Sequence, residues 1–90
     1  MSSISSGYTV LIPRKVTKQI SRFPKEYQRA IYSSFKSLET TPYLGKKLED
    51  RIKDKYSLRV GVYQILYELF KKELVILIVS VAHRKEVYRR

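Results

Sequence analysis

The sequence of 90 residues contains no cysteine and no tryptophan, and only three glycines and three prolines. Without cysteine the chain can form neither a disulfide nor a thiolate metal site, a usage that suits a reducing cytoplasm. Its longest apolar run, Leu74 to Ala82, is far shorter than the roughly 20 residues that a membrane helix needs. The segment from Met1 to Gly7 lacks the basic and apolar regions of a signal peptide. We therefore expect a soluble cytoplasmic protein that does not span a membrane.

Acidic residues are also scarce, because eight Asp and Glu stand against 19 Lys and Arg and leave a net charge of +11. Such a charge favours polyanionic partners: nucleic acid, the ribosome, an anionic membrane surface or an acidic protein. Charge that serves only solubility is the alternative. The hydrophobic fraction of 43% is ordinary for a folded protein. We expect one domain, residues 1–90, with a small core.

The last third of the chain predicts three consecutive strands. Residues 56–60 and 62–70 are rich in β-branched and aromatic residues, and residues 74–82 are almost wholly apolar. Gly61 separates the first two runs and residues 71–73 separate the last two. Breaks as short as these close hairpins, so we predict an antiparallel three-strand meander.

The first half of the chain predicts one more strand and two helices. Residues 8–12 form a short β-prone run that should join the sheet. Prolines 13 and 24 fit helix starts, and each is followed by apolar residues at helical spacing. These residues are Val16, Ile20 and Phe23 in the first helix, and Tyr27, Ile31, Phe35 and Leu38 in the second. The predicted fold class is α+β: an N-terminal strand, then a two-helix antiparallel hairpin packed on one face of a mainly antiparallel sheet.

Residues 41–55, the connector, link the second predicted helix to the meander. Leu44, Leu48 and Ile52 lie four residues apart, which allows a short helix, although Gly45 weakens it. The connector also carries a cluster of cations: Lys46, Lys47, Arg51, Lys53 and Lys55. A contact with phosphate needs only a positive charge and a side chain long enough to reach it. Two interpretations of the connector therefore stay open: a solvated loop, or a rim of the site that follows RNA phosphates.

Alternation along the predicted strands gives the sheet an apolar face and a polar face. The second strand places its most apolar set on one side: Tyr63, Ile65, Tyr67 and Leu69. This side is the better candidate for the face that the helices cover, which leaves Arg59 and Gln64 on the open face. The segment after the third strand should complete a basic concave surface there, lined by Arg59, Gln64, His83, Arg84 and Tyr88.

These residue types suit the cleavage of RNA by its own 2′-OH, a reaction that needs no metal and no cofactor. Guanidinium groups bind phosphate oxygens and stay charged, so arginine suits the charge that develops on the phosphate. Imidazole titrates near neutral pH, which makes His83, the only histidine, the candidate acid or base. Tyr88 could stack on a base, donate to a phosphate or act as a base among so many cations. In the alternative interpretation these residues have structural roles only: His83 caps a strand, Tyr88 packs on the core, and the final arginines form a basic tail.

The pattern of the C-terminal residues resembles the RelE/ParE toxin superfamily, and best its RelE branch of mRNA-cleaving toxins from toxin–antitoxin modules. It reads Tyr56-x-Leu58-Arg59-Val60-Gly61-x-Tyr63-x-Ile65-x-Tyr67-Glu68, and closes on His83-Arg84-Lys85-Glu86-Val87-Tyr88. The resemblance implies a toxin of a type II toxin–antitoxin system that acts as a ribosome-dependent, metal-independent mRNA endonuclease. The products would be a 2′,3′-cyclic phosphate and a 5′-OH, and translation would stop. The implied partners are the ribosome, mRNA and a RelB-like antitoxin, with a toxin–antitoxin heterotetramer left open.

The resemblance also assigns roles position by position. Arg59 matches a basic residue of the first meander strand, His83 and Arg84 match the basic residues after the last strand, and Tyr88 matches a functional C-terminal tyrosine. The implied catalytic set is therefore Arg59, His83, Arg84 and Tyr88. Contacts with RNA or the ribosome are expected from Lys46, Lys47, Arg51, Lys53, Lys55, Gln64, Lys85, Arg89 and Arg90. For the connector the resemblance implies a loop with Leu48 docked on the core.

At two positions this sequence departs from the pattern. Ser57 and Gln64 stand where members of the family carry basic residues, which weakens the expected phosphate-binding set. One hypothesis is that His83 and the connector lysines compensate.

Two other functions stay open. A ParE-like inhibitor of DNA gyrase would need neither His83 nor Tyr88, and a plain nucleic-acid-binding module would use its cations only to hold phosphate. Titratable groups that converge on one surface favour the nuclease.

Overall fold

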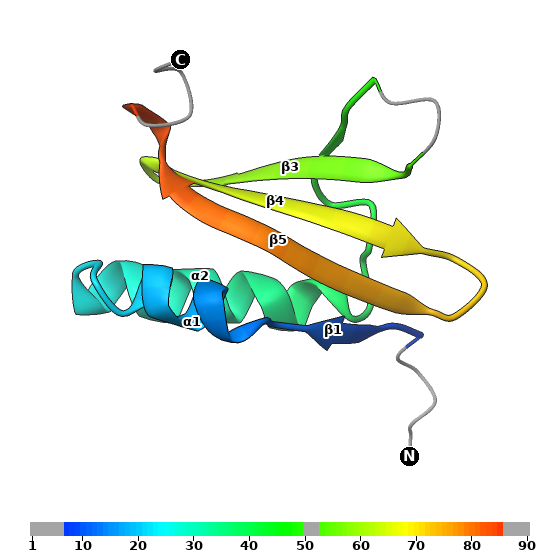
Figure 1. Ribbon diagram of the computed structural model, residues 1–90, viewed down its shortest axis with the longest axis horizontal. Coiled ribbons are helices and arrows are strands. Elements are labelled where there is room, and N and C mark those ends of the chain that lie inside the picture. The colour runs from blue at the N-terminus through cyan, green and yellow to red at the C-terminus, as the bar shows by residue number, and fades with distance from the viewer. Residues whose placement is uncertain (1–6, 50–52, 86–90) are drawn as a thin grey trace.

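The computed structural model describes residues 7–49 and 53–85. Its helices and strands are β1 (Thr9–Leu11), α1 (Arg14–Ile20), α2 (Lys25–Leu38), β2 (Lys46–Lys47), β3 (Lys55–Val60), β4 (Tyr63–Phe70) and β5 (Val75–His83). The five strands form one sheet in the order β1-β5-β4-β3-β2, and both helices lie on one side of it (Figure 1). The α+β fold predicted from the sequence is confirmed.

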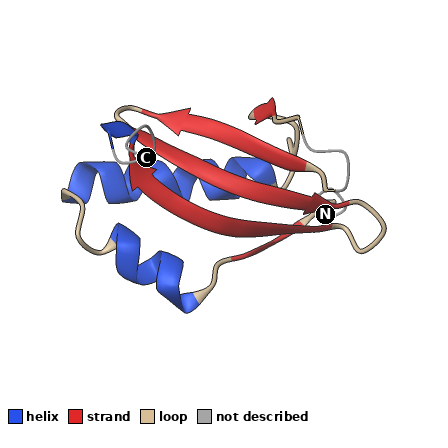
Figure 2. Ribbon diagram, turned by 45° about the horizontal axis from the view of Figure 1, so that its top comes forward, coloured by secondary structure: helices blue, strands red, loops and turns tan. Residues whose placement is uncertain are grey.

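Each helix begins directly after a proline and buries the predicted apolar stripe. Pro13 precedes α1 and Pro24 precedes α2, positions where the missing backbone N–H costs nothing. The buried helix residues are Val16 and Ile20 of α1, and Ile31, Phe35 and Leu38 of α2. α1 packs on β5, while α2 contacts both β1 and β3, and a turn at residues 21–24 brings the second helix back along the sheet (Figure 2). In the described part of the chain, no helix is long and apolar enough to cross a membrane.

The three C-terminal strands form the predicted antiparallel meander. β3 and β4 pair up to Val60 and Tyr63, so Gly61 and Val62 alone close the first hairpin. Gly61 has a φ of 61°, a left-handed conformation that favours glycine, and a Cβ there would lie 2.8 Å from Cε1 of Tyr27. β1 joins the opposite edge of the sheet, parallel to β5, with Thr9 beside Val75.

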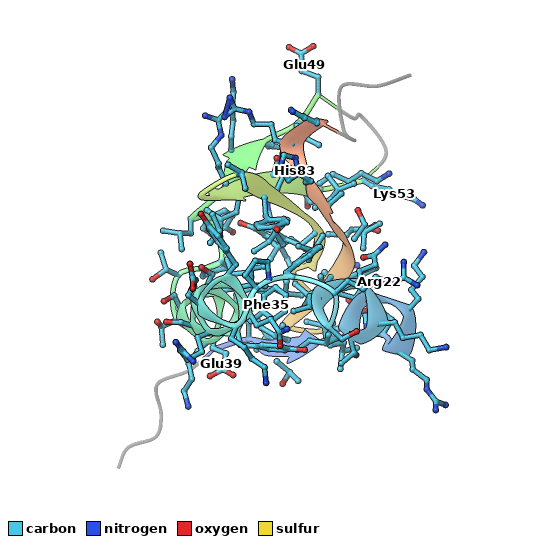
Figure 3. All side chains as sticks on the ribbon, turned by 90° about the vertical axis from the view of Figure 1, so that its left-hand side faces the viewer. Arg22, Phe35, Glu39, Glu49, Lys53 and His83 are labelled. Atoms are coloured by element: carbon cyan, nitrogen blue, oxygen red, sulfur yellow. The ribbon has the colours of Figure 1, made fainter. Side chains whose placement is uncertain are left out.

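The helices cover the face of the sheet that the sequence predicted. The buried side chains of β4 are Tyr63, Ile65, Tyr67 and Leu69. Aromatic rings fill much of this layer: Phe23 stacks on Tyr63 at 4.1 Å between centroids, and Tyr56 stacks on Tyr67 at 5.4 Å. Figure 3 shows Phe35 inside the molecule at the helix layer, and Glu49 and Lys53 on the sheet side. Neither helix covers the opposite face of β3 and β4, the open face of the sheet.

A β-bulge in β5 changes which of its residues face the helices. Tyr67 pairs with Ile78 but Leu66 pairs with Ser80, so Val79 is an extra residue in β5. Ile78 is buried before the bulge and Val81 after it. Because side chains alternate along a strand, the extra residue moves Ser80 and Ala82 to the open face and places His83 on the face that the helices cover.

The described part of the connector makes a turn at residues 42–43 and forms the two-residue strand β2, so the short helix that the leucine spacing allowed does not form there. The buried Tyr67 hydroxyl donates a hydrogen bond to the carbonyl of Pro42 at 2.8 Å and accepts one from the N–H of Gly45 at 2.9 Å. The chain then runs beside β3 as the two-residue strand β2, with Lys46 paired to Ser57. The connector backbone thus bonds to Tyr67 and to β3 in place of the hydrogen bonds that a helix would make. Leu48 is half-buried and lies outside the hydrophobic core, so its expected docking on the core is wrong.

Candidate functional site

A groove of about 560 Å³ opens between the connector and the open face of the sheet. β3 and β4 contribute Ser57, Arg59 and Gln64 to its lining, and the connector contributes Leu44, Lys46 and Leu48. Three of the residues that the sequence predicted for the site, Lys46, Arg59 and Gln64, are thus brought together here.

Arg59 is the cation that β3 presents at this groove. It is exposed and lies opposite Gln64 in the β3–β4 ladder. Within residues 7–49 and 53–85 its guanidinium makes no ion pair. A guanidinium in this state can offer its planar set of N–H donors to a phosphate.

Ser57 and Gln64 form an uncharged pair between the strands. The side-chain Nε2 of Gln64 donates a hydrogen bond to Oγ of Ser57, its diagonal neighbour across the ladder, and both side chains are half-buried. The two departures from the family pattern are therefore in contact with each other. Each member of this uncharged pair has a cation directly opposite it in the sheet, Lys46 beside Ser57 and Arg59 beside Gln64.

Lys47 is paired with a carboxylate and does not line the groove. It lies opposite Tyr56, on the face that the helices cover, and its Nζ is 3.0 Å from Oδ1 of Asp54. Lys71 approaches the other oxygen of Asp54 at 3.9 Å. The hydrogen bond from Lys47 lowers the pKa of Asp54 below its ordinary 3.8. The pair therefore contributes stability above that value and loses it as the pH falls through the lower folded pKa.

The other described cations of the connector, Lys53 and Lys55, do not line the groove. Lys53 is exposed on the sheet side of the molecule (Figure 3), and Lys55 is half-buried opposite Glu68 in the ladder. Arg51 lies outside the described residues. Contacts of all these cations with RNA stay predictions.

His83 lies away from the groove, contrary to the expectation that it would line one concave surface with Arg59 and Gln64. Its ring meets the ring of Tyr63 edge-on, with centroids 5.5 Å apart. The physical reason is the bulge at Val79, which turns His83 to the opposite face of the sheet from Gln64. Its Nδ1 accepts a hydrogen bond from the N–H of Lys85 at 3.1 Å, so it binds the helical residues 84–85 that follow β5. A catalytic role for His83 stays a prediction.

The residues after β5 are described only in part. Arg84 and Lys85 are exposed, and the N–H of Arg84 donates to the carbonyl of Val62 at 2.7 Å. The predicted residues Tyr88, Arg89 and Arg90 lie outside the described residues. No group of three or more His, Asp or Glu side chains in the described ranges could hold a metal ion.

Sequence reasoning missed Leu44, Leu48 and Ser57 as lining residues of the groove. Their only local signal was the spacing of the leucines, which pointed to a helix. The sequence marked Ser57 only as a position where the family pattern has a basic residue. The hydrogen bond that Ser57 accepts from Gln64 depends on the register between β3 and β4.

Residues 11–88 match a family model described as the ParE toxin of type II toxin–antitoxin systems, parDE. Toxin RelG of Mycobacterium tuberculosis is 28% identical over 85 residues, which cover 92% of this chain and 98% of that protein. The archaeal RelE–RelB complex of Pyrococcus horikoshii contains a chain with a TM-score of 0.78 and 29% identity, covering 93% of this chain and 99% of that one. The toxin–antitoxin complex RelBE2 of M. tuberculosis gives a TM-score of 0.75 at 26% identity, over 87% and 99%.

Proposed function

The chain belongs to the ParE toxin family of type II toxin–antitoxin systems and is a RelE-like toxin, and we propose on that premise that it stops translation by cutting mRNA on the ribosome. The observation that carries this proposal is the exposed guanidinium of Arg59, which makes no ion pair with the residues that the structure describes and lies beside a groove on the open face of the sheet. A charge of +11 supports docking on ribosomal RNA and strengthens the attraction of mRNA to the same surface.

In the proposed reaction the 2′-OH of one nucleotide attacks its own 3′-phosphate. The new bond closes a 2′,3′-cyclic phosphate while the bond to the 5′-oxygen of the next nucleotide breaks. One proton leaves the 2′-OH and one is delivered to the departing oxygen, which becomes a 5′-OH. Negative charge builds on the phosphate oxygens in between, and Arg59 stabilises it with fixed N–H donors.

The proton transfers fall to the segment that follows β5. Among the described residues that line the groove there is neither an imidazole nor a carboxylate. We therefore assign the proton transfer to Tyr88, and we give His83 the role of setting the start of that segment through its bond to Lys85. Arg84 follows directly and adds a second guanidinium on the exposed side.

We further propose a cognate antitoxin as the partner that keeps the toxin inactive. Support comes from two relatives that were solved as complexes, RelE–RelB of P. horikoshii and RelBE2 of M. tuberculosis. The strongly basic surface favours an antitoxin segment with acidic and apolar side chains that covers the open face. A toxin–antitoxin heterotetramer in the cytoplasm is the proposed resting form.

The proposal is tested by tightly induced expression in bacteria while the 5′ ends of mRNA are mapped. Wild type should arrest growth and produce new cuts within translated reading frames. Arg59→Ala should reduce the cutting rate by about 100- to 1000-fold, because one fixed donor to the transition-state charge is lost. Arg14→Ala is the matched control, an exposed arginine at the start of α1, and should leave the cuts unchanged. Arrest without cuts rules the nuclease out.

Inhibition of DNA gyrase is the second candidate, favoured by two observations. The matching family model is that of ParE, and His83 lies on the other face of the sheet from Gln64 and the groove. A gyrase inhibitor needs no proton transfer, so its toxicity should survive both His83→Ala and Tyr88→Phe. Accumulated DNA breaks without 2′,3′-cyclic RNA ends would identify it.

A further inference from the structure

The two-residue turn between β3 and β4 connects the two arginines of the proposed site. Arg59 lies two residues before Gly61, the first residue of the turn. Arg84 is tied to the second turn residue, because its backbone N–H donates a hydrogen bond to the carbonyl of Val62 at 2.7 Å. The position of this turn therefore affects where both arginines lie.

The turn has no buried side chain of its own. Gly61 has a positive φ and Val62 does not, a combination that fits a type II′ turn, and both residues are exposed. Glycine also loses more conformational freedom on folding than any other residue. A contact from another element is therefore the means by which this turn can be anchored to the core.

Tyr27 of α2 supplies such an anchor. Its ring lies directly against Gly61, since a Cβ on that glycine would be 2.8 Å from Cε1 of the tyrosine. The same ring meets the ring of Tyr63, the residue that follows the turn, edge-on with centroids 5.1 Å apart. Within residues 7–49 and 53–85 the hydroxyl of Tyr27 makes no hydrogen bond. The contacts of Tyr27 with the turn are thus made by its ring.

Tyr63 continues this support to the end of β5. Its ring stacks on Phe23 at 4.1 Å between centroids and meets the ring of His83 edge-on at 5.5 Å. Gln28 holds the helix side of the cluster, because its Nε2 donates to the carbonyl of Phe23 at 2.8 Å. The α1–α2 turn, the β3–β4 turn and the end of β5 all lie at the left-hand end of the molecule in Figures 1 and 2. Aromatic rings therefore link the helices to the residue that precedes Arg84.

From this arrangement we infer that Tyr27 is a positioning residue of the RNA-cleaving site. It acts through the β3–β4 turn, which sets the spacing between Arg59 and Arg84. Two strand spacings, about 10 Å, separate β3 from β5, so arginines carried by these two strands can act on one phosphate from either side. A misplacement of about 1 Å in such an arrangement can cost about 100-fold in rate. The inference rests on the proposed function, because it names a residue that serves the same site.

The first measurement is amide hydrogen exchange on the purified full-length chain. In Tyr27→Leu the amide of Arg84 should exchange about tenfold faster, because the turn that carries its acceptor loses its anchor. Tyr27→Phe keeps the ring and should match wild type. Tyr32→Leu is the matched control, since Tyr32 lies in the same helix and also meets another ring edge-on, that of Phe35 at 5.5 Å.

The pattern of exchange separates positioning from a general loss of stability. Amides of the β4–β5 ladder that exchange only when the whole fold opens report global stability. The amide of Arg84 should respond to Tyr27→Leu more strongly than they do. Equal acceleration of all amides, or the same acceleration at Arg84 in Tyr32→Leu, overturns the inference.

The second measurement is single-turnover cleavage of mRNA on purified ribosomes. Misplaced guanidinium groups stabilise the transition state less, so the rate constant at saturating toxin should fall about 10- to 100-fold in Tyr27→Leu. The toxin concentration at half saturation should stay the same, because the substitution removes no charge. Tyr27→Phe should keep the wild-type rate constant. An unchanged rate constant in Tyr27→Leu overturns the inference.

The two measurements let the inference and the proposed function fail separately. Hydrogen exchange needs neither ribosome nor cleavage. A wild-type chain that cuts no mRNA overturns the nuclease, and the exchange rates then decide whether Tyr27 holds Arg84 in place. Cuts by the wild type together with an unchanged Arg84 amide in Tyr27→Leu uphold the nuclease and overturn the positioning role.

Discussion

At the scale of single residues, the hydroxyl group of Tyr67 joins two distant parts of the chain. The side chain is fully buried, and its hydroxyl bonds Pro42 and Gly45, residues 25 and 22 positions away in the sequence. Burial raises the pKa of Tyr67 above its ordinary 10.0. The connector side of the groove therefore depends on one neutral phenol in the core.

Tyr67→Phe should lower the free energy of unfolding by about 1–3 kcal/mol, because the buried carbonyl of Pro42 and the half-buried N–H of Gly45 lose their partner. Urea unfolding at neutral pH measures this loss, and Tyr32→Phe, at an exposed position of α2, should cost almost nothing. The difference between wild type and Tyr67→Phe should narrow above pH 10. There the unfolded tyrosine ionises, so the stability that the raised pKa contributes is lost as the pH rises. An equal cost in both variants would contradict this role.

At the scale of elements, α1 supports β5 beyond the point where its neighbouring strand ends. β1 pairs with β5 only over residues 75–77, and no other strand of the described residues lies beside the rest of that edge. The side chain of Gln19 in α1 fills part of this gap and accepts the backbone N–H of Val81 at 3.0 Å. Val81 lies two residues after the bulge residue Val79 and two before His83. The helix thus stabilises the segment that sets the direction of His83.

Gln19→Leu should destabilise the fold by about 1–3 kcal/mol, since the N–H of Val81 loses its acceptor. Gln19→Glu keeps an acceptor oxygen at the same distance along the side chain and should retain most of the stability. Hydrogen exchange of the Val81 amide gives a local measurement, with faster exchange expected in the leucine variant alone. Unchanged exchange at Val81 in Gln19→Leu would show that the strand does not depend on this bond.

At the scale of the whole molecule, the cations that give the net charge of +11 are not equally available to bind RNA. Lys46 and Lys47 are neighbours in β2 but belong to different faces of the sheet. Lys46 lines the groove, and Lys47 is bound to Asp54. Only cations that are free to meet phosphates release counterions when RNA binds.

Binding of a short single-stranded RNA should therefore weaken with salt, and the slope of log affinity against log salt should report these residues. Lys46→Ala should make the slope shallower by about 0.7, the value for one phosphate contact on a single strand. Lys47→Ala removes the same formal charge and should change the slope much less, because that charge is already paired. Fluorescence anisotropy from low to moderate salt measures both. Equal changes of the slope in the two variants would mean that the face of the sheet on which a lysine lies does not affect its contact with RNA.

The periodicity of the sequence alone predicted the two helices, the three-strand meander and the buried side of β4. The same alternation placed Arg59 and Gln64 together on the open face. These features could be predicted because each follows from neighbouring residues: helical spacing, strand alternation, prolines before helices, and Gly61 in a tight turn.

The tertiary structure alone decided the side of the sheet on which His83 lies and the path of the connector. Residues 75–82 are almost wholly apolar, so no alternation marks their inward side, and the extra residue Val79 reverses it without a local signal. The connector carries leucines at helical spacing, yet Tyr67 and β3 supply partners that a local pattern cannot contain. Interactions between neighbours in the sequence fixed the elements of this protein. Contacts between residues far apart in the chain fixed which side chains share the groove.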